Sequence, residues 1–276
     1  MDEFLSLLKE MDVKDTSLSN DNSVNEETDK KIKFFCDIEY FFDYVFCIDV
    51  TSDMTSLLKT IKEVCANLYN RNKDFFSNYS SNKKLDSLRV KIIAFRDVYW
   101  DEKYWIETSD FFILPSQTNE LLAYLNTLEA KGGGDEPESS LEALALAMRA
   151  DWVKINDLST QRARHVIVLC TDSASHSFEE SKSLELDHYP LGMPNSYKEL
   201  LMMWNGSQPL DRSTEESFYM DKSAKRLFIF APEECYPWYD ISEDFEYMCL
   251  VPVERGSGFS DVSSDVMLEV LFNTIY

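Results

Sequence analysis

The segment Asp49-Val50-Thr51-Ser52-Asp53 places three oxygen-bearing side chains at alternate positions of a short polar stretch. It follows the apolar run 44–48, which is typical of a strand buried on both faces of a parallel sheet. Open α/β sheets bind their ligands at the carboxyl ends of such strands. Carboxylate and hydroxyl oxygens are the ligands that hard cations prefer. We therefore predict that Asp49, Thr51 and Asp53 contribute to a metal site at the tip of a central strand.

Two further acidic residues follow segments that could bring them to the same place. Asp172 comes directly after the apolar run 166–170, so it is expected at the tip of a second buried strand. Asp135 follows three consecutive glycines, in a chain that has seven glycines in all. Consecutive glycines are costly unless the backbone needs positive φ or a very close approach. We expect this loop to pack against a bound group.

The elements that must position these residues alternate between strand-like and helix-like patterns. Segments 104–106 and 111–113 follow the strand at 88–95 too closely for a crossover helix, so they should pair with it in antiparallel fashion. The predicted fold class is α/β, with a doubly wound, mostly parallel, Rossmann-like sheet and one antiparallel edge strand. The strands are expected at 44–48, 88–95, 164–170, 225–232 and 247–252, and helices at 55–69, 118–128, 141–148, 196–204 and 260–276.

The chain is expected to form one domain with an appended tail. Residues 1–33 are polar and acidic, which predicts a flexible N-terminal tail. Residues 34–276 carry the strand and helix patterns. Within them, residues 174–222 are weakly periodic and contain aromatic residues and prolines, so we interpret this segment as an insertion that forms a lid or a docking surface.

Composition limits the classes of function. Hydrophobic residues make up 44% of the 276 residues, enough for a real core, and the formal net charge is −23. Such a charge argues against binding to nucleic acid or to an anionic membrane, and favours cationic partners or metal ions. The six cysteines lack zinc-type spacing, and no leader or membrane-spanning run is evident. We expect a cytoplasmic protein with free thiols.

The motifs together resemble those of the von Willebrand factor A (vWA) domain and its metal-ion-dependent adhesion site (MIDAS). They are DxTxD at 49–53, GGGDxPE at 132–138, and TD at 171–172 with a downstream histidine. The resemblance covers most of residues 43–276. The segments 95–97 and 226–232 make the chain look most like stand-alone bacterial vWA proteins of the tellurite-resistance or kinase–phosphatase-associated type.

The resemblance implies a ligand set and a cation. The family's first motif falls on Asp49, Thr51 and Asp53, its threonine position falls on Asp135, and its third-motif aspartate falls on Asp172. The implied ion is Mg²⁺, or Mn²⁺ or Ca²⁺. Asp53 and Asp135 depart from the hydroxyl residues of the pattern, and four ionised aspartates would exceed the charge of a divalent ion by two. Such a site should retain its cation but attract a partner's carboxylate poorly.

Structural interpretations of the same residues stay open. Asp49, Asp172 and Asp135 could cap helices, and Asp53 could be a solvent-facing acid at a helix start. Asp97 is expected to pair with Arg96 or with a nearby loop. His176 is expected to support the site rather than to bind the ion, and the aromatic group at 236–239 belongs either to the core or to a recognition surface.

Three functions remain compatible with these patterns. The preferred one is a non-enzymatic, metal-dependent protein-interaction or scaffolding module, and the resemblance implies a kinase or phosphatase encoded nearby as its partner. The second is a metal-dependent phosphohydrolase, although Thr51 stands where aspartyl-phosphate enzymes place a second acid, and no convincing general base accompanies a nucleophile. The third is a degenerate vWA platform without metal.

Overall fold

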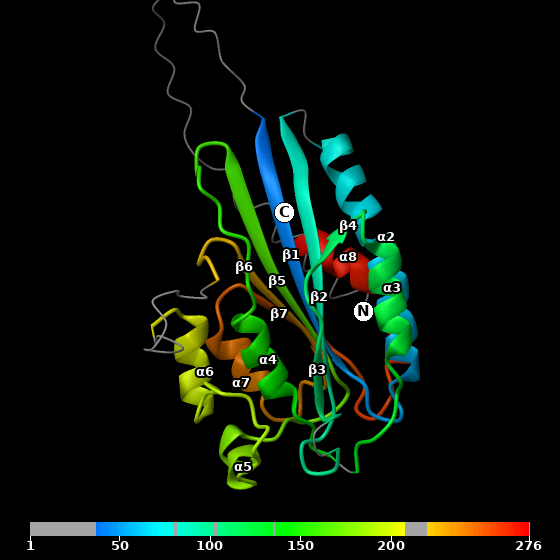
Figure 1. Ribbon diagram of the computed structural model, residues 1–276, viewed down its shortest axis with the longest axis vertical. Helices are drawn as coiled ribbons and strands as arrows, with labels where there is room; N and C mark the ends of the chain where they lie inside the picture. Colours follow the sequence, from blue (N-terminus) through cyan, green and yellow to red (C-terminus); the bar gives the residue numbers. More distant parts are fainter. Residues whose placement is uncertain (1–36, 80–81, 102–103, 135, 208–219, 276) are drawn as a thin grey trace, which may run out of the picture.

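The computed structural model describes residues 37–79, 82–101, 104–134, 136–207 and 220–275. In this part of the chain, seven strands form one sheet in the order β3-β2-β1-β5-β6-β7, and β4 also pairs with β2 (Figure 1). The pairings among β1, β2, β5, β6 and β7 are parallel, whereas β3 and β4 run antiparallel to β2. The strands are β1 (Ile38–Asp49), β2 (Lys83–Phe95), β3 (Ile106–Thr108), β4 (Phe112–Leu114), β5 (Gln161–Cys170), β6 (Lys225–Ala231) and β7 (Met248–Pro252). The predicted fold class is confirmed, and the antiparallel edge consists of two short strands in succession.

Helices cover both faces of the sheet (Figure 1). They are α2 (Thr55–Tyr79), α3 (Thr118–Thr127), α4 (Ser140–Met148), α5 (Phe178–Ser183), α6 (Tyr197–Trp204), α7 (Trp238–Asp244) and α8 (Ser264–Ile275). Successive side chains of a strand point to opposite faces, and β1 is apolar at nearly every position. On one face of the sheet, Phe42 and Phe46 pack with α2, α3 and α8. On the other face, Val45 and Cys47 pack with α4, α6 and α7. The continuous apolar run of β1 therefore follows from its burial in the middle of the sheet.

Two helices differ from their predicted bounds. α2 continues ten residues beyond the expected end at Tyr69, because the ring of Phe76 packs at a tilt against that of Tyr40, with the ring centroids 4.9 Å apart. α8 begins at Ser264 instead of Ser260. Phe259 has a φ of +61°, so the chain turns there before the helix can start.

Two further sequence predictions concern the N-terminal tail and the segment between β5 and β6. The predicted tail 1–33 lies outside the described residues. The segment between β5 and β6 contains α5 and α6, and Trp204 of α6 packs into the core on the α4 face. No helix in the described ranges combines the length and the apolarity that are needed to cross a bilayer.

A buried ion pair ties β1 to β2 near the middle of the sheet. Asp43 is 1% exposed, and its two carboxylate oxygens accept hydrogen bonds from Nε and an Nη of Arg89 at 2.7 and 2.6 Å. The backbone N–H of Val153 donates to the same carboxylate at 2.6 Å. The carboxylate is thus removed from water but satisfied by three donors, which is the condition under which a buried charge is tolerated.

We expect Arg89→Met to lower the free energy of unfolding by about 3–5 kcal/mol, because it leaves a buried carboxylate without its counter-charge. Urea denaturation at neutral pH measures this loss. The matched control is Lys84→Met on the same strand, which removes an exposed pair with Glu39 and should leave stability nearly unchanged. Equal effects of the two substitutions would contradict this interpretation of the Asp43 pair.

Candidate metal site

Three loops meet at the carboxyl ends of β1, β2 and β5 (Figure 1). The N–H of Val50, just after β1, donates to the carbonyl of Phe95 at the end of β2 at 3.0 Å. The carbonyl of Val50 accepts from the N–H of Lys131 at 2.9 Å, and the Ser52 hydroxyl donates to the carbonyl of Gly132 at 2.7 Å. The glycine loop is therefore fastened directly onto the turn that follows β1.

Asp49 is the last residue of β1 and is fully buried. Its Oδ1 accepts from the N–H and the hydroxyl of Thr51 at 3.0 and 2.7 Å, and its Oδ2 accepts from the hydroxyl of Thr171 at 2.8 Å. Burial raises its pKa to about 6, although these hydrogen bonds act in the opposite direction. Asp49 precedes the start of α2 by six residues, so the helix-cap interpretation is wrong for it.

Asp172 lies on the loop after β5 and is 7% exposed. Its Oδ2 accepts from the N–H of Gly258 at 2.6 Å. Its pKa is raised by burial, and the charges of Glu136 and Asp53 add to the increase. The helix-cap interpretation is wrong here as well, because Ser177 caps the next helix, α5.

Gly258 joins the loop after β7 to the turn after β1. It has a φ of +60°, and a Cβ at this position would lie 2.4 Å from the carbonyl oxygen of Asp53. Only glycine permits this approach while its N–H holds Asp172. The side chain of Asp53 is exposed and that of Thr51 is half-buried, so the two residues border the site from the solvent side.

The three consecutive glycines each allow a close contact with another side chain of the protein, whereas the predicted packing against a bound group stays a prediction. A Cβ on Gly132 would lie within 2 Å of the Asp101 carboxylate, and one on Gly134 would strike the ring of Trp100. A Cβ on Gly133 would lie 2.8 Å from Cγ2 of Thr51 and 3.1 Å from Oε1 of Glu138. The side chains of Thr51 and Glu138 therefore both approach the Cα of Gly133. The predicted ligand Asp135 lies outside the described residues.

Glu138 is a site residue that the sequence reasoning missed. It is 5% exposed, and its Oε2 is buried without a hydrogen-bond partner. Burial raises its pKa to about 10, and the charges of Asp49, Asp97, Asp101 and Asp172 add to the increase. Its position in the GGGDEPE segment, three residues after Asp135, was the available signal. Its burial against Thr51 could not be read from spacing.

Asp97 and His176 form a second polar pair beside the site. One oxygen of Asp97, which is 1% exposed, accepts from the Tyr99 N–H at 2.8 Å and lies 3.1 Å from Nε2 of His176. Of the two expected pairings of Asp97, the one with Arg96 is wrong and the one with a nearby loop is confirmed. Arg96 instead donates hydrogen bonds to the carboxylate of Glu107 at 2.9 Å and to three backbone carbonyls. Its guanidinium is therefore satisfied without Asp97.

The donor set fits a hard cation, although no group of three or more His, Cys, Asp or Glu side chains in the described ranges forms a ready-made metal cage. Asp49, Glu138 and Asp172 are oxygen donors that affect one another's pKa, and Thr51 adds a hydroxyl. Mg²⁺ is commonly held through one or two carboxylates and several waters rather than by a full protein cage. The unpartnered Oε2 of Glu138 is the observation that tests the fit, because a buried carboxylate oxygen of this kind needs a cation or a proton.

The aromatic group after β6 divides between the core and the surface, and its predicted role in recognition stays a prediction. Trp238 is fully buried, and its Nε1 donates to the carbonyl of Ser173 at 2.9 Å, which supports the Asp172 loop. Tyr236 and Tyr239 are 43% and 55% exposed. The core and surface interpretations therefore apply to different members of one segment.

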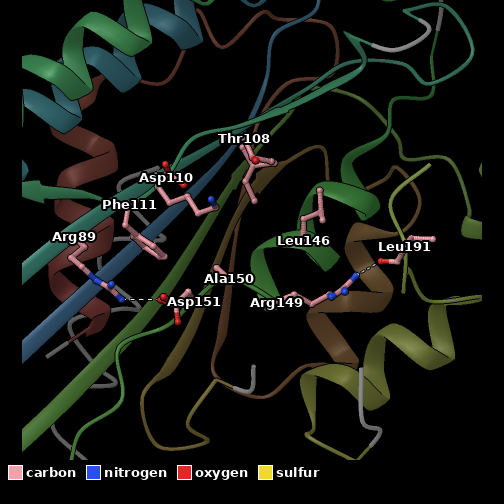
Figure 2. A pocket seen from close by; sticks show the side chains of 11 residues that line it. Arg89, Thr108, Asp110, Phe111, Leu146, Arg149, Ala150, Asp151 and Leu191 are labelled. Carbon is pink, nitrogen blue, oxygen red and sulfur yellow. Dashed lines mark hydrogen bonds between the residues drawn. The ribbon is translucent and has the colours of Figure 1, made fainter. Parts of the chain in front are cut away.

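A separate hollow of about 560 Å³ lies between β2 and the end of α4. Figure 2 shows Arg89, Phe111 and Asp151 on one side of it and Arg149 with Leu191 on the other. None of the proposed ligands Asp49, Thr51, Glu138 and Asp172 lines it. The hollow is therefore distinct from the strand-tip site.

No protein-family model matches the chain, and no curated protein matches it. Solved structures do resemble it. One is a von Willebrand factor type A protein from Catenulispora acidiphila, with 9% identity, a TM-score of 0.44, and coverage of 86% of this chain and 42% of that one. Another is the pilus adhesin SpaC from Lactobacillus rhamnosus GG, with 12% identity, a TM-score of 0.43, and coverage of 84% and 29%.

A third is proximal thread matrix protein 1 from the mussel byssus with a zinc-occupied MIDAS motif, with 9% identity, a TM-score of 0.43, and coverage of 85% and 48%. The chain spans less than half of the length of each of these three proteins. The solved structures that it resembles thus include a vWA protein and a protein with a metal-occupied MIDAS.

Proposed function

We propose that the chain is a vWA-type protein-interaction module that binds a divalent cation, Mg²⁺ or else Mn²⁺ or Ca²⁺, at the loops after β1 and β5. The observation that carries the proposal is Glu138. Its Oε2 is buried and unpartnered, the charges of Asp49 and Asp172 act on its carboxyl group, and its other oxygen lies beside Gly133, as Thr51 does. Three buried carboxyl groups in one place are unfavourable without a cation, which supports an ion-binding role.

The proposed ligands are Asp49, Thr51, Glu138 and Asp172, with Asp53 and Asp135 carried over from the sequence resemblance. When bound, the ion supplies positive charge to buried carboxylates and holds the three loops together. The donors of Asp49 already fix its orientation, since Thr51 and Thr171 occupy both of its oxygens from the protein side. An ion would add to these contacts on the remaining lone pairs.

The phosphohydrolase alternative has less support. The hydroxyl of Thr51 stands where aspartyl-phosphate enzymes need a second acid, and it donates to Asp49 itself at 2.7 Å. The metal-free platform remains distinguishable by experiment. We further propose, from the sequence patterns, that residues 34–276 form one domain behind an acidic tail and that the protein acts in the cytoplasm. From the resemblance we propose a kinase or phosphatase as its partner.

Asp49→Asn should make the metal-free protein more stable at pH 7. The pKa of Asp49 rises from 3.8 when unfolded to about 6 when folded. Because the folded state holds the proton more tightly, ionisation costs stability progressively between about pH 4 and pH 6, and that cost persists above pH 6. The shift corresponds to about 3 kcal/mol, and Asn retains an acceptor for Thr51.

Urea denaturation in chelator from pH 4 to pH 7 tests this expectation. The gain of the variant over the unsubstituted protein should grow with pH across that range. Asp74→Asn, which removes a surface carboxylate of α2, controls for the loss of one charge. A variant that is no more stable than the original at pH 7 would contradict the cost assigned to Asp49.

Divalent cations should raise the melting temperature of the unsubstituted chain relative to chelator. An ion present at 100 times its dissociation constant stabilises by about 2.7 kcal/mol. Asp49→Asn and Glu138→Gln should each abolish most of this response, because each removes a charged oxygen donor. Differential scanning calorimetry with Mg²⁺, Mn²⁺ and Ca²⁺ measures it, with Glu129→Gln as an exposed control. A flat response of the unsubstituted chain would favour the metal-free platform.

A further inference from the structure

Exposed aromatic side chains gather beside the candidate metal site. Tyr99 and Trp100, on the loop after β2, are 42% and 62% exposed, and Tyr236 and Tyr239 are exposed as well. We call these four residues together with His176 the aromatic strip. Large aromatic residues that remain exposed in a group mark surfaces that bind other molecules.

Contacts connect the segments that carry these side chains. The ring of Trp100 lies against Gly134 of the glycine loop, and the ring of its neighbour Tyr99 lies 4.6 Å from that of His176. Ser175, next to His176, donates its N–H to the carbonyl of Tyr236 at 2.9 Å. Tyr239 follows three residues later, in the first turn of α7. The strip therefore runs from the glycine loop, past the Asp97–His176 pair, to α7.

Acidic side chains lie near both ends of the strip in the described part of the chain. Glu179, Glu180 and Asp240 are close enough to raise the pKa of Tyr236 after the effect of burial. At the other end, the Asp101 carboxylate accepts from the N–H of Gly133 at 2.9 Å. The nearby cation Arg255 is already paired with Glu136. Acidic side chains thus flank exposed aromatic rings at both ends.

We propose that the aromatic strip binds a partner segment that carries lysine or arginine side chains. This inference rests on the proposed function and specifies its partner. Aromatic faces attract ammonium and guanidinium groups, and the flanking carboxylates add complementary charge. A basic segment is therefore accepted here, and an acidic one is repelled.

Fluorescence anisotropy with labelled octalysine, octaglutamate and an uncharged Gly-Ser octapeptide tests the proposal at 0.15 M salt with Mg²⁺. The net charge of −23 attracts any polycation, so the decisive comparison keeps that charge constant. Trp100→Ala/Tyr236→Ala/Tyr239→Ala should weaken octalysine binding at least tenfold. The control Ile113→Ala/Leu158→Ala, which removes two exposed apolar side chains elsewhere, should leave it unchanged.

Equal octalysine affinity in the triple variant and the unsubstituted chain would overturn the proposal, as would preferential binding of octaglutamate. If the triple variant does not fold, the octalysine affinities of Tyr239→Ala and Tyr239→Phe are compared instead. The proposal predicts weaker binding for the alanine variant only. Calorimetric melts with and without Mg²⁺ test the metal site separately. If Mg²⁺ does not change the melting temperature but the strip variants still lose octalysine binding, the proposed partner surface is supported and the proposed metal site is contradicted.

Discussion

The structure depends on one constraint: a carboxylate buried at the carboxyl end of the central strand. Asp49 has no access to water, so the surrounding chain supplies its hydrogen-bond donors from Thr51 and Thr171. Those donors belong to loops after two neighbouring parallel strands, and their positions follow from the pairing of β1 with β5. The arrangement satisfies the oxygens but does not neutralise the charge, as the raised pKa of Asp49 indicates.

The loops around this carboxylate are shaped by close contacts rather than by apolar packing. Gly133 lets the backbone approach Thr51 and Glu138 closely, and Gly258 lets the loop after β7 reach both Asp53 and Asp172. Each contact adds an acidic group to a region that already holds one. Natural proteins accept such local destabilisation at functional sites, where a bound group compensates for it. The local destabilisation by neighbouring acidic groups is thus an argument that the site binds a compensating group.

Much of the fold followed from sequence patterns, and the site followed in part. Apolar runs before Asp49 and Asp172 predicted their strand-tip positions because buried parallel strands leave a strong signal. Glu138 escaped prediction because its burial depends on how the glycine loop folds over Thr51, which is a tertiary property. The pairing of Asp97 with His176 joins residues 79 positions apart, and spacing alone favoured Arg96. Phe76 lengthened α2 through a contact with Tyr40 that helical periodicity could not reveal.

Isothermal titration of Mg²⁺ into the metal-free chain, in buffers of different ionisation enthalpy at pH 7, tests the central claim most directly. The pKa of Glu138 is raised to about 10, so its carboxyl group is protonated before the ion binds and must ionise to become a ligand. Metal binding that deprotonates a ligand releases its proton, and we expect about one per ion. Glu138→Gln should remove this proton release. Absence of binding heat, or binding that Asp49→Asn leaves unchanged, would contradict a metal site at the tip of β1.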